Sequence, residues 1–212
     1  GIQSGGNMMQ HTGQIASIFC YRLTLITAPL AALGLVGAKS ATDLEQSLRL
    51  AATQLDDLSP DSTKKFVDET SNNLRKLSTV VPQETKDMGD AMYYLVSSLT
   101  IDPKTAQGFI EPLSRFATAM NTTTEESTKS ITPMLNVWRD LATGPEGVNK
   151  ALEIMFQTIR RSAGQPAEVA RQAGDFMAIA KQAGETSPAA PMAIYAQATR
   201  TAPSVSEAAT WS

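Results

Sequence analysis

The chain contains few of the residues on which most catalytic and metal sites depend. Its 212 residues include one cysteine, Cys20, and one histidine, His11. A single cysteine excludes an intrachain disulfide, and a single histidine excludes a histidine-rich metal site. His11 lies in a glycine-rich leader, and Cys20 lies among apolar residues, where a thiol is unreactive. We therefore expect no enzyme activity, no cofactor and no bound metal.

Short catalytic signatures are absent as well. The sequence contains no GxxxxGK[ST], GxSxG or HExxH motif and no EF-hand loop. The adjacent carboxylates Asp56–Asp57 and Glu125–Glu126 would point about 100° apart on a helix, so we expect them to cap helices or face solvent. A net charge of -3 disfavours a protein whose main task is to neutralise phosphates. We expect no specific nucleic-acid binding.

Charge is also missing from most of the N-terminal leader, residues 1–38, in which Arg22 is the one charged side chain. The uncharged stretch from Leu23 to Ala38 is shorter than the roughly 20 residues of a transmembrane helix. Extending it back to Ile15 would place Arg22 inside the span. We expect this apolar leader to pack against other protein, with membrane insertion as the alternative. Its candidate partner contacts are Thr27, Pro29, Leu30, Leu33, Leu35 and Val36.

From Lys39 onward the pattern is helical, without sustained alternation of apolar and polar residues. Helix starts recur about every twenty residues, and the connections are short. The first helix is expected to open with a capping box from Thr42 to Glu45, and a helix around Pro112 is expected to kink or break. We predict a mainly α fold, an array of short antiparallel helices that forms a compact bundle.

Two features subdivide this helical region. Gly144–Pro145 is the strongest linker signal in its second half, so we divide the region into residues 39–143 and 144–212. The chain stops soon after a new helix cap, Ser204 to Glu207, so we expect the sequence to be a fragment of a longer chain.

Tyr93 and Tyr94 are candidate contact residues in the helical region. They adjoin the apolar stripe that includes Met92 and Leu95, and adjacent helical residues cannot both face one stripe. A tyrosine that turns away from the core offers an apolar ring and a polar hydroxyl to a partner. Both are therefore partner-contact candidates, with a purely structural role as the alternative.

Several motifs occur in an order that resembles phage tail tape-measure proteins. Thr27-Ala28-Pro29-Leu30 is followed by Lys39, Asp43 and Glu45, with Leu44 where that family more often has Phe. Ala91, Met92 and Leu95 resemble a later family helix, although Ser97-Ser98 follows where the family usually has Ala-Gly. Two longer stretches are also similar to the family, LSRFATAMNTTTEESTKSITPMLNVW and GETSPAAPMAIYAQATRTAPSVSEAA.

The resemblance implies a long, mostly helical protein that lies inside the tail tube, sets tail length during assembly and leaves before the genome passes. It implies a homo-oligomer of sister copies, as a trimer, with tail-tube and tail-tip or baseplate proteins as partners. Host membrane contact would occur on ejection. The location would be the tail-tube lumen or tail tip of the virion, and the host cytoplasm during assembly.

Two other functions remain open at this point. One is a membrane-active helical protein, such as a pore-forming toxin or an effector, in which Ile15 to Ala38 inserts as a hairpin around Pro29. The other is a helical adaptor that buries the leader against one soluble partner.

Overall fold

The computed structural model describes residues 37–54 and 59–211, all within one compact unit of the chain, Gly34–Ser212. These residues form helices and turns, with no strand among them, which confirms the predicted mainly α fold. The helices are α2 (Gly37–Ala52), α3 (Pro60–Ser78), α4 (Thr85–Leu99), α5 (Pro103–Met120), α6 (Thr124–Val137), the 3₁₀ helix η1 (Arg139–Ala142), α7 (Pro145–Arg161), α8 (Pro166–Gln182), α9 (Ala189–Ala198) and α10 (Val205–Trp211).

Most helices begin where local chemistry favours a start. Four of them have proline in the first turn, where its missing N–H costs no hydrogen bond: α3, α5, α7 and α8. The Asp102 side chain accepts from the Thr105 amide, and the Thr123 hydroxyl forms a reciprocal capping box with Glu126. These short-range bonds explain why the helix starts could be read from the sequence.

One local expectation is wrong, and a second is wrong in part. The capping box predicted from Thr42 does not open the first helix, because α2 already begins at Gly37. The intervening Ala38-Lys39-Ser40-Ala41 contains residues that tolerate a helix well, so the helix extends a turn upstream. Of the kink or break expected at Pro112, the break is absent, since α5 runs through it, and the kink stays a prediction. A proline within a helix removes one backbone hydrogen bond, and the packing of the buried neighbours Ile110 and Leu113 keeps α5 continuous.

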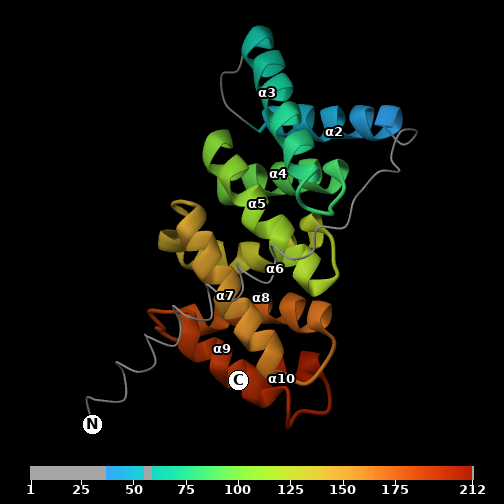
Figure 1. Ribbon diagram of the computed structural model, residues 1–212. Helices are drawn as coiled ribbons and strands as arrows, with labels where there is room; N and C mark the ends of the chain where they lie inside the picture. The colour runs from blue at the N-terminus through green and yellow to red at the C-terminus, as the bar shows by residue number, and fades with distance from the viewer. Residues whose placement is uncertain (1–36, 55–58, 212) are drawn as a thin grey trace. The chain divides into compact units, whose positions relative to one another are not determined.

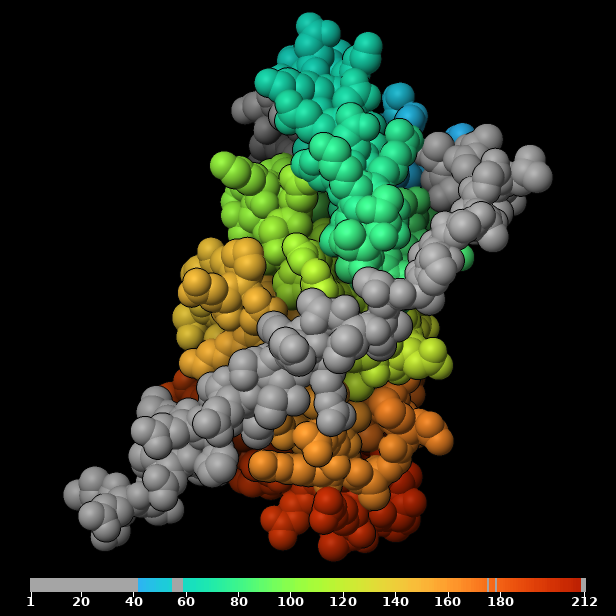
Figure 2. Space-filling view, in the orientation of Figure 1, coloured from blue at the N-terminus to red at the C-terminus, as the bar shows by residue number. Residues whose placement is uncertain are grey.

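Helices two apart in the chain make the most extensive contacts, so they stack in a row: α2 on α4, α4 on α6 and α6 on α8. Figure 1 shows this order, and the colours of Figure 2 follow it. A second row joins α5 to α7 and α7 to α9, and α10 packs on α8. The helical array therefore repeats a two-helix unit, and each unit contacts mainly its neighbours.

Stacked helices run parallel. Between α4 and α6, Lys129 Nζ lies over the Tyr94 ring and, further along both helices, Arg139 after α6 donates to the Leu99 carbonyl. Between α6 and α8, Pro133 meets Gly174 and, further along, Trp138 meets Lys181.

Glycine permits the closest approaches between stacked helices. A Cβ added to Gly89 of α4 would lie 2.9 Å from Leu44 Cδ1 of α2, and one added to Gly174 of α8 would lie 2.9 Å from Pro133 Cγ of α6. Apolar residues of the same helices fill the core beside these contacts. Met88, Met92 and Leu95 of α4 are fully buried, and burying each such side chain stabilises the fold by about 2 kcal/mol.

Contacts also cross the predicted boundary at Gly144–Pro145. Helix α7 packs on α5, and α8 packs on α6. The division into residues 39–143 and 144–212 stays a prediction about sequence organisation.

No helix in the described residues is both long enough and apolar enough to cross a membrane.

Candidate functional site

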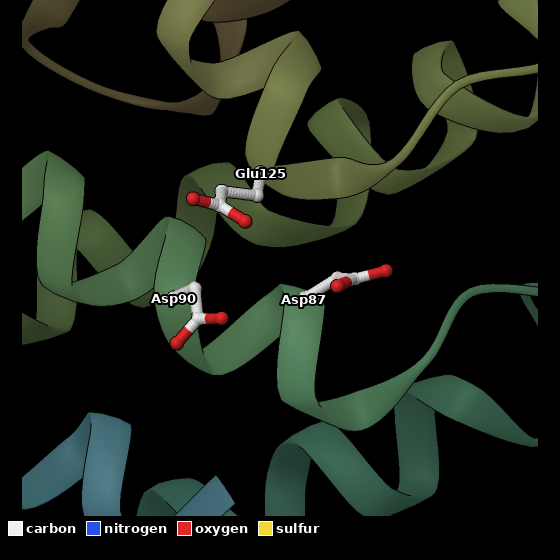
Figure 3. A group of neighbouring side chains, drawn as sticks. All are labelled: Asp87, Asp90 and Glu125. Carbon is white, nitrogen blue, oxygen red and sulfur yellow. The ribbon is translucent and has the colours of Figure 1, made fainter. Parts of the chain in front are cut away.

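Three carboxylates lie together between α4 and α6 (Figure 3). Asp87 and Asp90 come from neighbouring turns of α4, and Glu125 comes from the first turn of α6. One oxygen from each lies within 4.8 Å of the others. The parallel stacking of α4 on α6 produces this acidic cluster, because it places the early turns of both helices side by side.

Two of the three carboxylates already have a cationic partner. The Lys86 ammonium donates to Asp90 Oδ2 at 2.5 Å, and the Lys129 ammonium donates to Glu125 Oε1 at 2.6 Å. Asp90 also accepts a hydrogen bond from the Ser47 hydroxyl of α2. Each ion pair lies within one helix, so the contacts that cross between helices here are the Ser47 hydrogen bond from α2 and the contact of Lys129 with the Tyr94 ring.

The pKa shifts agree with this network. The hydrogen bond from Lys86 to Asp90 raises the pKa of the lysine, and the hydrogen bond to Glu125 does the same for Lys129. The pKa of Asp87 is also raised, first because the carboxyl is partly buried and then because Glu84 is close. The charged form of Asp87 is therefore disfavoured in the folded state.

The donor set does not suit a hard divalent cation. Calcium and magnesium need oxygen lone pairs directed at one point. Here Lys86 and Ser47 engage both oxygens of Asp90, and Lys129 engages Glu125. We therefore interpret the acidic cluster as two ion pairs, one within α4 and one within α6, beside the half-buried Asp87.

The predicted contact residues Tyr93 and Tyr94 lie on the same helix as the two aspartates, and both are half-buried. The Tyr94 ring centroid is 6.0 Å from the Lys129 ammonium, within the range of a cation–π interaction. Their role in partner binding stays a prediction. Thr27, Pro29, Leu30, Leu33, Leu35 and Val36 lie outside the described residues.

A groove of about 420 Å³ opens one step further along the row, between α6 and α8. Its apolar lining includes Phe116 and Met120 from the end of α5, Ile159 from the end of α7, and Ala170 of α8. Charged residues of both signs, from α6 and α8, also line it: Glu126, Lys129, Glu168 and Arg171. A groove of this volume is in the range of ligand and side-chain pockets.

Among the residues that line the groove, Ser127 has a buried hydroxyl without a partner in the described part of the chain. Ser127 is 2% exposed, and its hydroxyl makes no hydrogen bond within the described part of the chain. Its neighbours Thr128 and Ser130 donate to carbonyls one turn earlier in α6, which is the usual solution for a hydroxyl on a helix. A buried hydroxyl without a partner costs free energy, so Ser127 marks a place where a bound group would be favoured.

Sequence reasoning missed both the acidic cluster and the groove. The signal that would have found them is the number of sequence positions that separates facing residues on stacked helices. Glu126 and Glu168 are 42 positions apart, as are Lys129 and Arg171. Neither pair is notable until that offset is known.

Comparisons with known proteins connect the helical array to a family. A family model described as phage-related minor tail protein matches residues 71–211, which extend from within α3 to the end of α10. The comparison with curated proteins and the comparison with solved structures gave no match.

Proposed function

The chain belongs to the phage-related minor tail protein family, and from this membership we propose that it is part of a tape-measure protein. Family membership establishes a structural role in the phage tail and a virion-associated location. The finer proposal is that the protein lies in the tail-tube lumen, sets tail length during assembly and is released to help genome ejection.

The observation that carries the proposal is the extent of the family match. It covers the helical array almost to its end, and the motifs that resemble tape-measure proteins lie both inside the matched residues and before them. A ruler made of helix has a physical basis, because an α-helix rises about 1.5 Å per residue and so converts gene length into tail length.

The proposed partners follow from that role. Sister copies would assemble as a trimer, and tail-tube and tail-tip or baseplate proteins would surround them. The protein would be present in the host cytoplasm during assembly and would contact the host membrane on ejection. Its part would be structural, without enzymatic activity or a cofactor.

The test is a series of in-frame deletions and duplications of helical sequence in the complete phage gene, outside the segment that encodes residues 37–211. Tail length would be measured by electron microscopy of purified particles. We expect a change of about 1.5 Å for each residue removed or added. A duplication is the matched control for each deletion, because it must lengthen the tail while leaving the array intact.

Tails of unchanged length that still contain the protein would overturn the ruler proposal and leave the structural role in the tail. Quantitative mass spectrometry of the same particles gives the copy number, and three copies for each tail are expected. Any other stoichiometry would contradict the trimer.

A further inference from the structure

The groove between α6 and α8 has a repeated charge pattern on its two walls. On α6 an acidic residue, Glu126, is followed three positions later by Lys129, and on α8 Glu168 is followed three positions later by Arg171. Because α6 and α8 are parallel, both walls have their acidic residue nearer the helix start and their basic residue nearer the middle. The groove thus has an acidic end and a basic end.

The two walls differ in how far their charges are already satisfied. On α6, Lys129 pairs with Glu125, and Glu126 accepts from the Thr122 hydroxyl and the Thr123 amide. On α8, neither Glu168 nor Arg171 has an ion-pair partner among the described residues. The α8 wall therefore offers one unpaired charge of each sign, one helical turn apart.

The lining between these charges is apolar, apart from hydroxyls. Phe116 and Ala170 are buried beneath it, and Met120 and Ile159 are partly exposed to it. Ser127, whose buried hydroxyl has no partner among the described residues, is one of the lining residues. An occupant must bring an apolar side chain for this lining, a polar group for Ser127, and charges of opposite sign at its two ends.

We propose that the groove between α6 and α8 binds an amphipathic α-helix of a partner protein, which presents a basic and an acidic residue one helical turn apart, beside the large apolar side chains that enter the groove. The basic residue meets Glu168 and the acidic residue meets Arg171, while Glu126 and Lys129 of α6, which already have partners, give the groove the same direction of charge. A helix fits better than an extended strand because residues three and four apart share a helix face, which matches the spacing of the charges on both walls.

The experiment uses the whole 212-residue chain and a synthetic helical probe peptide. The probe has an alanine background, with a lysine and a glutamate one turn apart and, at neighbouring positions of the same face, a leucine and a phenylalanine one turn apart. A fluorescent label allows its binding to be followed by anisotropy. Two further peptides serve as controls: one has glutamine at both charged positions, and the other has serine at both apolar positions.

The main variant reverses the charges of one wall, Glu168→Lys with Arg171→Glu. In this variant no orientation of the probe satisfies both walls, so we expect affinity to fall about fivefold for the charged probe and to stay unchanged for the glutamine peptide. The matched control is Glu146→Lys with Lys150→Glu, an exposed pair in the early turns of α7 that does not line the groove. It should bind the probe as the unaltered chain does.

A second variant, Ser127→Ala, separates binding from folding. The hydroxyl has no partner in the free protein, so its removal should leave the unfolding midpoint unchanged or higher. If the hydroxyl bonds to the inserted helix, the same variant should bind the probe several-fold more weakly. A variant that loses stability and binds normally would contradict the assignment.

Other results would overturn the proposal. One is the absence of saturable probe binding by the unaltered chain. Another is an equal loss of probe affinity in the α8 and α7 charge-reversal variants. A third is undiminished binding of the serine peptide, which would indicate a non-specific charge interaction. Self-association that the probe abolishes would assign the groove to a second copy in place of another protein. None of these outcomes depends on the length-setting proposal, which the tail-length measurement tests separately.

Discussion

The junction between α4 and α6 and the junction between α6 and α8 share one geometry but differ in their contents. Both bring together parallel helices whose early turns lie side by side. In the first junction, ion pairs and a glutamine side chain fill the space near the helix starts, whereas in the second a groove remains. The stacking alone thus does not decide whether a junction is closed, since the side chains at a few positions do.

The largest expected effect concerns Gln83, which helps to close the first junction. Its side chain bonds to Thr118 Oγ1, to the Thr122 carbonyl, and to the amide and hydroxyl of the buried Thr124, at 3.0 to 3.3 Å. Gln83→Ala would leave the Thr124 amide without its partner, so we expect a loss of about 2 kcal/mol in the free energy of unfolding, measured by urea denaturation.

The matched control is Gln165, which immediately precedes α8. It is exposed and makes no side-chain capping bond. Gln165→Ala should change stability by less than about 0.5 kcal/mol. Equal effects at the two positions would contradict the contrast between the junctions.

A smaller effect is expected at the contact between α8 and α6. A Cβ at Gly174 would lie 2.9 Å from Pro133 Cγ, closer than side-chain atoms normally approach. Gly174→Ala should therefore cost about 1 kcal/mol, because the stacked helices must shift apart. Gly144→Ala is the control, since no atom lies within 4 Å of the added Cβ. Thermal unfolding of both variants tests this, and equal midpoints would rule out tight packing at Gly174.

Two carboxyl groups, Glu126 beside the second junction and Asp87 beside the first, should make opposite contributions to the pH dependence of stability. Glu126, at the groove, has a lowered pKa because it accepts from the Thr122 hydroxyl and the Thr123 amide. Its stabilising contribution is present above the ordinary glutamate pKa and is lost as the pH falls through the lowered value. Compared with the unaltered chain, Glu126→Gln should therefore lose less stability between pH 7 and pH 3 in urea titrations.

Asp87, in the acidic cluster, provides the opposite case. Its pKa is raised by burial, so its ionised form opposes folding above that pKa and its protonation removes the penalty. Asp87→Asn should be slightly more stable than the unaltered chain at pH 7, with a difference that shrinks toward pH 3. A stabilisation that does not vary with pH would show that the carboxyl charge is not its cause.

The smallest effect is expected from the ion pair of Lys86 and Asp90. Both side chains are partly exposed, at 45% and 24%, so the pair contributes about 0.5 kcal/mol. A double-mutant cycle with Lys86→Met and Asp90→Asn would measure it. A coupling energy near zero would show that this pair within α4 contributes nothing to stability through its charges.

The sequence by itself was sufficient to predict the fold class and most helix starts. Prolines such as Pro103 and caps such as Thr123 act through hydrogen bonds within about four residues, so their effect can be read locally. The same local reasoning was wrong at Thr42, where the helix begins a turn upstream, and in part at Pro112, where the helix continues without a break.

Only the tertiary structure decided which helices stack and which side chains meet. Ser47 and Asp90 are 43 positions apart, and Arg139 and Leu99 are 40 apart, yet each pair is hydrogen-bonded. No local signal specifies such pairs, because their offset follows from how the apolar faces of whole helices pack. The acidic cluster and the groove could therefore not be predicted from the sequence, whereas the helices that form them could.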